Sequence, residues 1–314
     1  MTTRTELRHQ KKKRKWPKWV MGIIIVLLLL GGGLLYYVWD KVHHTVDLMH
    51  NPLERDVNPE RQEALQSLFK NNESINLLLL GVDERAGDRG RSDTMILLSL
   101  NPKTNTILML SIPRDTRMFI PGHGLDKINH AYAYGGVPLS VETVEDTFGI
   151  PINFYALVNM EGFEDGIDAI GGVTVYNKQT FTQDGIKFNE GNIHLNGAEA
   201  LSYIRMRKSD PRGDIGRNER QREVVQAAMD EAASFTTITK IGEILTILGG
   251  NVETNLHMDQ LQQLFLGYRN TRNNIRSLEL KGNGQTIGGV WYYIVSDTEF
   301  NRITSEIKNH MESH

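Results

Sequence analysis

Three short apolar runs follow one another near the start of the sequence, and each has the length of a β-strand. They are INLLLLGVD (75–83), TMILLSL (94–100) and TILMLSI (106–112). Runs of this length, bounded by polar turn residues, are typical of strands buried inside a sheet. The polar segment NPKTN joins the second run to the third, so we expect these two strands to form an antiparallel hairpin.

Further along the chain, helical and strand patterns alternate. Helical spacing covers 138–149, 161–172, 197–248, 258–268 and the residues after Asp297, which we expect to be the N-cap of the last helix. Strand patterns cover 154–160, 173–176, 275–280 and 291–295. The alternation predicts an α/β fold of the mixed α+β kind, with a central mixed β-sheet flanked by helices.

The longest apolar run, residues 19–39, contains no charged side chain. As a helix its 21 residues would span roughly 32 Å, about the thickness of the hydrocarbon core of a bilayer. Tryptophans lie at both ends, and KKKRKWPK precedes the run, which places the N-terminus in the cytoplasm. A cleaved signal peptide is the alternative, but the run is long for one and no Ala-x-Ala site follows.

This reading divides the chain into four parts. Residues 1–18 form a basic cytoplasmic tail, and 19–39 form a transmembrane helix that precedes the folded part. Residues 40–73 form a stalk with a short helix at 59–70, and 74–314 form an extracellular folded domain. The expected location is therefore the cell membrane, with a single membrane crossing and the C-terminal domain outside.

Charge and composition exclude several classes of function. Eight Lys and Arg lie within residues 1–18, so the rest of the chain carries more acidic than basic residues. That balance argues against nucleic acid as a partner. The chain has no cysteine, which excludes disulfides, thiolate metal sites and a cysteine nucleophile. No GxSxG, P-loop or HExxH motif occurs.

Charged residues mark the ends of the first three strands. Asp83 follows the first, Arg91 and Asp93 precede the second, and Arg114 follows the third. If the first two strands are also antiparallel, all of these residues lie at one end of the sheet. Carboxylates beside arginines suit a divalent cation such as Mg²⁺ together with an anion. The alternative is a solvated loop whose charges pair with one another.

A second group of arginines lies in RMRKSDPRGDIGRNERQRE, residues 205–223. Arg205 and Arg207 can share a face only if the preceding helix ends here and the chain straightens. Arg217, Arg220 and Gln221 then fall on one face of the first turns of a new helix. Guanidinium groups near a helix N-terminus are suited to binding phosphate. The alternative is an exposed helix with surface Arg–Glu pairs.

The pattern as a whole resembles the LytR-CpsA-Psr family of Gram-positive envelope proteins, most closely its wall teichoic acid transferases. The resemblance rests on LLLGVDER, RSDTMILLSL, SIPRDT, KINHAYAYGG and ALSYIRMRKSDPRGDIGRNERQREV, and it covers the anchor and residues 75–235. It implies transfer of an anionic glycopolymer from an undecaprenyl-pyrophosphate carrier to the muramic acid 6-hydroxyl of peptidoglycan, through a phosphodiester.

The resemblance also implies roles for individual residues. Asp83 and Asp93 match the carboxylates that hold Mg²⁺, or Mn²⁺ in its place. The residues that match the pyrophosphate-binding set are Arg91, Arg114, Arg205, Arg207, Arg217 and Gln221, with Arg85 and Arg220 beside them. Asp93, Arg114 and Arg207 are the expected catalytic residues. Asp93 is the expected base, or Asp83 if Asp93 is committed to the metal.

Two other functions remain open at this point. The same site could use water as the acceptor, which would make the chain a polyprenyl-pyrophosphate hydrolase. The chain could also be a non-catalytic receptor for the lipid carrier, or an attenuator of transcription. Direct DNA binding is not expected, because the sequence has no helix-turn-helix candidate with a basic face.

Overall fold

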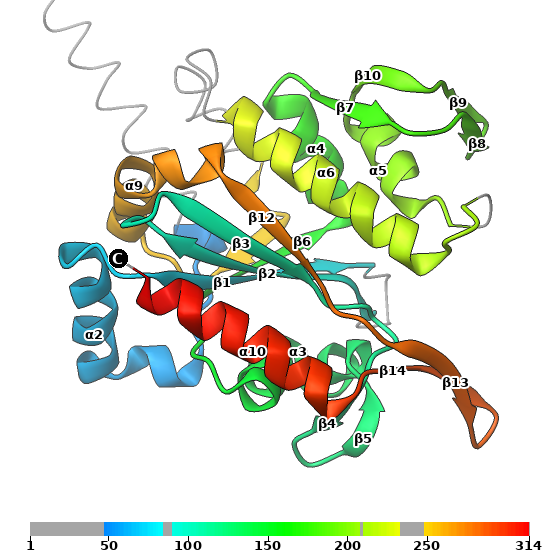
Figure 1. The fold of residues 1–314 in the computed structure, drawn as a ribbon. Helices are drawn as coiled ribbons and strands as arrows, with labels where there is room; N and C mark the ends of the chain where they lie inside the picture. Colours follow the sequence, from blue (N-terminus) through cyan, green and yellow to red (C-terminus); the bar gives the residue numbers. More distant parts are fainter. Residues whose placement is uncertain (1–46, 84–89, 208–209, 233–247, 314) are drawn as a thin grey trace, which may run out of the picture. The chain divides into compact units, whose positions relative to one another are not determined.

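The computed structural model describes residues 47–83, 90–207, 210–232 and 248–313 (Figure 1). These residues fall in one compact unit, Val42–His314. The predicted basic tail and transmembrane helix lie outside the described residues. Among the helices that the structure does describe, none has the length and apolarity needed to cross a bilayer.

A six-stranded mixed sheet forms the centre of the fold, in the order β11-β6-β1-β2-β3-β12. The strands are β1 (Ile75–Val82), β2 (Ser92–Asn101), β3 (Thr106–Ser111), β6 (Phe154–Asn159), β11 (Val252–Thr254) and β12 (Ile275–Glu279). The predicted β2–β3 hairpin is confirmed, and β1 also runs antiparallel to β2. β6 and β12 are parallel to β1 and β3 respectively, which makes the sheet mixed.

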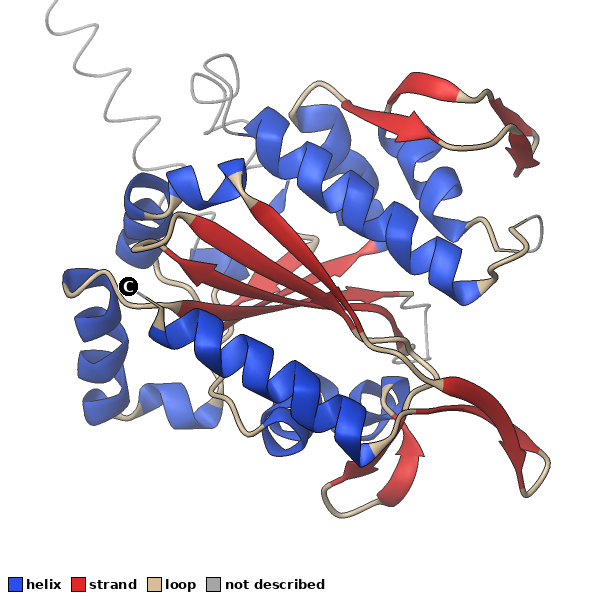
Figure 2. Ribbon diagram, viewed as in Figure 1, coloured by secondary structure: helices blue, strands red, loops and turns tan. Residues whose placement is uncertain are grey.

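Helices cover both faces of this sheet (Figures 1 and 2). α3 (Asn129–Phe148) and α10 (Asp297–Glu312) pack on one face, where Met95 and Leu97 of β2 join their core. Ile96 and Leu98 point to the opposite face, into a second core that includes residues of α2 (Pro59–Lys70) and α9 (Met258–Gly267). Because both faces are buried, the strands read as continuous apolar runs rather than alternating ones.

A smaller layer with its own core lies beside the sheet. It contains α4 (Met160–Ala169), α5 (Gly197–Arg205) and α6 (Asp214–Ala232) with two short two-stranded sheets. Their strands are β7 (Val173–Asn177), β8 (Phe181–Gln183), β9 (Ile186–Phe188) and β10 (Gly191–Leu195), paired antiparallel as β7–β10 and β8–β9. Val225 and Met229 of α6 pack against the second core of the sheet, so α6 joins the two layers.

Two further hairpins lie at the end of the sheet where β1 finishes and β2 begins. One is β4 (Arg117–Ile120) with β5 (Gly124–Lys127), and the other is β13 (Asn283–Ile287) with β14 (Val290–Ile294). The backbone N–H of Tyr293 in β14 donates to the carbonyl of Asp115, at 2.8 Å. This bond fixes β14 against the segment that follows β3.

The structure corrects the predicted start of the folded domain at Ser74. The preceding residues, including the 3₁₀ turn η1 (Glu54–Val57) and α2, belong to the same unit. Leu53 is buried in the first core of the sheet, and Leu65 and Phe69 of α2 are buried in the second. The described part of the predicted stalk therefore packs as part of the domain, and only its short helix was predicted correctly.

Helix boundaries differ from the sequence prediction at two places. α3 combines two helical segments that meet at a kink, where Gly136 has a positive φ of 65°. The second segment corresponds to the predicted helix at 138–149, whereas the first, which begins at Asn129, was not predicted. The N-cap of α10 is Ser296, whose side chain accepts from the backbone N–H of Glu299, and Asp297 is the first helical residue. A second 3₁₀ turn, η2 (Arg269–Asn273), leads into β12.

Candidate functional site

The predicted meeting of three strand ends is confirmed. In the register of the sheet, Val82 pairs with Ser92 and Ile96 pairs with Ser111. Asp83 just after β1, Asp93 at the start of β2 and Arg114 shortly after β3 therefore lie at the same end of the sheet. Arg114 donates a 2.8 Å hydrogen bond to a carboxylate oxygen of Asp93. Two predicted site features thus contact each other directly, although 21 residues separate them.

The turn that carries Arg114 is held by the start of α3. The backbone N–H of Asn129 donates to the carbonyl of Arg114 at 3.2 Å, and that of Ile128 donates to Thr116 at 2.9 Å. This support gives a role to the KINH segment, in which Ile128 and Asn129 are buried and whose role the sequence alone does not specify. His130 and Tyr134 bind Asp126 instead, away from the strand ends.

α5 ends where the arginine-rich stretch begins. Arg205 is its last residue, and Met206 is extended with φ −59° and ψ 128°, so the chain straightens as predicted. Arg205 contacts the sulfur of Met160 at the start of α4. Arg207 lies on the other side of the turn, with its Nε 3.6 Å from a carboxylate oxygen of Asp214. The two arginines therefore flank the site rather than lie side by side.

α6 begins at Asp214, as the sequence predicts, and it brings two polar side chains to the strand ends. Arg217 lies 3.0 Å from Asp214 in an i, i+3 ion pair. Gln221 donates a 2.8 Å hydrogen bond to the hydroxyl of Thr94, the residue after Asp93. Sequence reasoning missed Asp214, which contacts both Arg207 and Arg217, although an acidic residue in the first turn of a helix is a recognisable signal.

Arg220 does not point into the site, which corrects its placement beside the pyrophosphate-binding set. Its guanidinium donates to Asp210 at 2.6 Å and to the carbonyl of Met206, and it lies 5.8 Å from the ring of Phe181. Both Arg220 and Asp210 are buried. Arg220 and Gln221 point in different directions because successive residues of a helix are about 100° apart around its axis.

Two other predicted site residues, Arg91 and Arg85, are not placed in the site by the structure. Arg91 is exposed and does not line the pocket described below. Arg85 lies outside the described residues, as does most of the polar loop after β1. Within the described chain, the structure thus brings together Asp83, Asp93, Arg114, Arg205, Arg207, Arg217 and Gln221.

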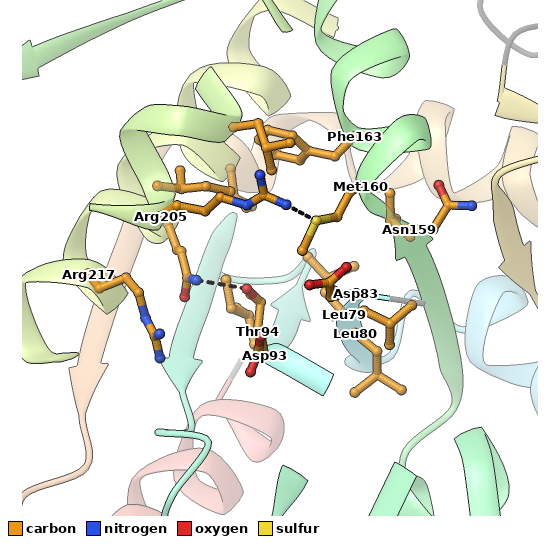
Figure 3. Close-up of a pocket in the computed structure, with 18 residues that line it drawn as sticks. Leu79, Leu80, Asp83, Asp93, Thr94, Asn159, Met160, Phe163, Arg205 and Arg217 are labelled. Atoms are coloured by element: carbon orange, nitrogen blue, oxygen red, sulfur yellow. Dashed lines mark hydrogen bonds between the residues drawn. The ribbon is translucent and has the colours of Figure 1, made fainter. Parts of the chain in front are cut away.

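Asp83, Asp93, Arg205, Arg217 and Gln221 line a cavity of about 400 Å³ between the sheet and helices α4, α5 and α6. Arg114 adjoins it through its hydrogen bond to Asp93, and Arg207 through Asp214, the ion-pair partner of Arg217. Figure 3 shows Asp83, Asp93 and Thr94 on the sheet side of the cavity and Arg217 on the helix side, with Arg205 directed toward the sulfur of Met160. The rest of its wall is mostly apolar. The apolar lining consists of Leu79, Leu80, Val82, Ile96, Val158, Met160, Phe163, Leu201, Ile204 and Val225. The volume is within the range of small-molecule sites, which commonly combine apolar walls with a few polar groups.

The charged end carries a concentration of guanidinium groups. Burial lowers the pKa of Arg217, and the nearby charges of Arg114 and Arg207 lower it further, against the opposite effects of Asp214 and Asp93. Burial alone would also lower the pKa of Arg114, but its hydrogen bond and ion pair with Asp93 raise it. The buried Nε of Arg217 has no hydrogen-bond partner among the described residues. An anion placed among the guanidinium groups of Arg114, Arg207 and Arg217 would stabilise the charged form of each.

The carboxylates fit a divalent cation only in part. Asp83 and Asp93 line the same cavity. Within the described part of the chain, no group of three or more His, Cys, Asp or Glu side chains could hold a metal. Two carboxylates with several open positions suit Mg²⁺, which keeps waters and takes ligands from a bound phosphate. The arrangement as a whole can hold an amphiphile with an anionic group at one end and an apolar chain at the other.

Comparisons with known proteins agree with this geometry. The model of the LytR_cpsA_psr family matches residues 36–309. The chain is 58% identical over 318 residues to the polyisoprenyl-teichoic acid–peptidoglycan teichoic acid transferase TagU of Oceanobacillus iheyensis, with 99% of each chain covered.

Solved structures of proteins named TagU and TagT are also similar to this chain. The crystal structure of Bacillus subtilis TagU matches with a TM-score of 0.64 and 42% identity, over 77% of this chain and 98% of that one. A structure described as TagT bound to LI-WTA matches with a TM-score of 0.67 and 34% identity, over 77% of this chain and 92% of that one.

Proposed function

Because the chain belongs to the LytR_cpsA_psr family, we propose that it transfers an anionic glycopolymer from a polyprenyl-pyrophosphate carrier to peptidoglycan. The proposed carrier is undecaprenyl pyrophosphate, the polymer is wall teichoic acid, and the acceptor is the 6-hydroxyl of muramic acid. One observation carries the proposal: a single cavity joins an apolar wall to a cluster of arginines and aspartates. The name of the Oceanobacillus relative, which this chain matches over nearly its whole length, supports the same activity.

The residues of the cavity suit the two ends of such a donor. Arg114, Arg207 and Arg217 surround the place where the pyrophosphate would bind, and Arg205 and Gln221 close it from the helices. Guanidinium groups bind phosphate oxygens in a planar, two-point geometry. The apolar wall between Leu79 of the sheet and Phe163 of α4 would take the first isoprenoid units.

In the proposed reaction, the acceptor oxygen bonds to the phosphorus that carries the polymer. The bond from that phosphorus to the bridging oxygen breaks, and the carrier leaves as polyprenyl monophosphate. The hydroxyl proton passes to a carboxylate, which we assign to Asp93, or to Asp83 if Asp93 is committed to a metal. The arginines stabilise the negative charge that grows on the bridging and leaving oxygens.

Asp83 and Asp93 would hold Mg²⁺, or Mn²⁺ in its place, together with oxygens of the pyrophosphate. A bound divalent cation neutralises charge on the phosphate oxygens. Asp93 also accepts the hydrogen bond from Arg114. Its carboxylate thus lies between a guanidinium group and the proposed metal position, which keeps it oriented toward the substrate.

We further propose that residues 19–39 anchor the chain in the cell membrane and that the described domain lies outside it. The lysines and arginines before the apolar run support this orientation. A membrane anchor would hold the cavity near the surface in which the lipid carrier is embedded. The polymer and its acceptor would meet on the outer side.

Product analysis tests the proposal. The full chain, reconstituted in lipid nanodiscs, is incubated with a lipid-linked polymer, with and without uncrosslinked glycan strands. We expect a polymer–glycan phosphodiester and polyprenyl monophosphate only when glycan is present. Release of free polymer at the same rate without glycan would identify a hydrolase instead. Tight binding of the lipid with no product would identify a receptor.

A further inference from the structure

Trp291 is a large aromatic side chain exposed at the edge of the site, and it is the only tryptophan among the described residues. It lies on β14 with 43% of its surface exposed. One side of its indole ring packs on Gly284 of β13, where an added Cβ would come within 2.8–3.0 Å of the ring atoms. Because Gly284 has no side chain, the indole ring packs directly on its backbone across the hairpin. This contact holds the ring in one orientation.

The position of Trp291 is fixed relative to Arg114. Tyr293, two residues further along the strand, shares its face of β14. The backbone N–H of Tyr293 donates to Asp115, at 2.8 Å, and its hydroxyl donates to the carbonyl of Leu280, at 3.0 Å. Trp291 and Tyr293 line one small hollow together with Arg114 and Asp214. The exposed indole is therefore held beside the proposed phosphate site.

The hollow and the large cavity lie on either side of one hydrogen bond. Asp93 lines the cavity, Arg114 lines the hollow, and the two side chains are joined at 2.8 Å. If the isoprenoid chain occupies the apolar cavity, the leaving phosphate is on that side. In-line displacement at phosphorus requires the attacking oxygen to approach from the opposite side, where Trp291 is exposed.

We propose that Trp291 is the stacking platform for a pyranose ring of the acceptor glycan strand, an inference that rests on the proposed transferase activity. A pyranose presents a flat apolar C–H face that can pack on an indole, while its hydroxyls reach polar groups at the rim. Ile215, 44% exposed and lining the same hollow, extends the apolar surface, and Asp115 and Asn218 supply acceptors and donors.

The rival occupant of this surface is the membrane itself, since tryptophan is also favoured at bilayer interfaces. The charges of the hollow favour the glycan. Asp115 and Asp214 line it beside Trp291 and pair with Lys127 and Arg217, so the carboxylates offset the basic side chains that an anionic lipid surface would attract. Arg114, the one basic residue of the hollow, is already paired with Asp93.

Trp291 provides its own spectroscopic probe. In the full chain with Trp16→Phe, Trp19→Phe and Trp39→Phe, all tryptophan emission comes from Trp291. Titration with uncrosslinked glycan of alternating N-acetylglucosamine and N-acetylmuramic acid, without donor lipid, should shift this emission to shorter wavelength and saturate. In transfer assays, Trp291→Ala should raise the acceptor KM roughly tenfold, with the donor KM little changed.

A matched control lies next to Trp291 in the sequence. Val290 is 42% exposed but faces the opposite side of β14, so Val290→Ala should leave the acceptor KM unchanged. Trp291→Phe keeps an aromatic ring on Gly284 and should recover part of the loss, which separates ring stacking from loosening of the hairpin. An unchanged acceptor KM in Trp291→Ala, or an equal loss in Val290→Ala, would overturn the proposal.

Two outcomes separate this inference from its alternatives. Nanodiscs with brominated lipids that quench Trp291, together with no response to glycan, would assign the surface to the membrane and overturn the proposal. A parent protein that consumes donor lipid but forms no polymer–glycan product would refute the proposed function itself. That failure is distinct, because the fluorescence titration reports glycan binding without any transfer.

Discussion

Arg220 donates a 2.6 Å hydrogen bond to Asp210, and both side chains are buried where the chain passes from α5 to α6. Asp210 also accepts from the backbone N–H of Arg212, and a Cβ on Gly216 would collide with its carboxylate. The pair thus ties the segment after Arg205 to the first turns of α6. It positions the arginines of the site without contacting the cavity.

Removal of Arg220 should unfold the protein more easily, because it leaves Asp210 buried and unpaired. Breaking one half of a buried ion pair typically costs about 3–5 kcal/mol, and we expect a loss of that size in the free energy of unfolding of Arg220→Ala. Denaturant titration of the full chain in detergent measures it. Arg212→Ala is the control: Arg212 also contacts Asp210 but is 45% exposed, and its loss should cost under about 1 kcal/mol. Equal losses would contradict the positioning role.

The same pair predicts a pH dependence of stability. Burial alone would raise the pKa of Asp210, but hydrogen bonds from Arg220 and Arg212 outweigh it and lower the pKa to about 2. The stabilisation is therefore present above the ordinary pKa of 3.8 and is lost as the pH falls toward 2. The parent should lose more stability than Asp210→Asn between pH 5 and pH 2, by about 2 kcal/mol.

Thermal unfolding over this pH range provides the comparison. Asp297→Asn, at an exposed position in the first turn of α10, serves as the control and should follow the parent. Parallel acid curves for the parent and Asp210→Asn would show that the pair contributes nothing to acid stability.

Much of the fold follows from the sequence because its main strands are buried on both faces. β1, β2 and β3 are continuous apolar runs, and their polar boundaries mark the strand ends where Asp83, Asp93 and Arg114 meet. β13 reads NGQTI and is mostly exposed on both faces, so it carries no apolar period. The first turns of α3 were not predicted for another reason: two adjacent glycines, Gly135 and Gly136, are typical of a turn.

The site was harder to predict where contacts depend on loops. Arg217 and Gln221 follow from helical spacing, and both line the cavity. The pairing of Arg220 with Asp210 depends on how the Pro-Gly loop folds back, and periodicity holds no information about it. The hollow beside Trp291 joins residues more than 70 positions apart, through the contact of Tyr293 with Asp115. Such a contact follows only from tertiary packing.

Metal binding should depend on the donor lipid, because Asp83 and Asp93 provide too few ligands for a closed site. Calorimetry of the full chain should show weak Mg²⁺ binding alone and tighter binding when a polyprenyl pyrophosphate is present. Asp93→Asn should remove the difference, whereas Asp297→Asn, far from the cavity, should keep it. Tight binding of Mg²⁺ without lipid, or an unaltered response in Asp93→Asn, would argue against the assignment.

The proposed orientation in the membrane is tested independently of chemistry. A reporter enzyme that is active only outside the membrane, fused after His314, should be active in cells. A cytoplasmic reporter at the same position should be silent. The reverse pattern would place the domain inside the cell and exclude the proposed acceptor.

The most direct test of the central claim compares two arginines of the same loop in the transfer reaction. Arg207 contacts Asp214 beside Arg217, whereas Arg212 binds Asp210 and Glu219 outside the cavity. A charge-assisted contact to phosphate contributes about 1.5–3 kcal/mol, so Arg207→Ala should lower kcat/KM for the lipid-linked donor by roughly tenfold to a hundredfold. Arg207→Lys should recover it in part, and Arg212→Ala should stay near the parent. Normal transfer by Arg207→Ala, or a greater loss in Arg212→Ala, would show that these arginines do not hold the pyrophosphate.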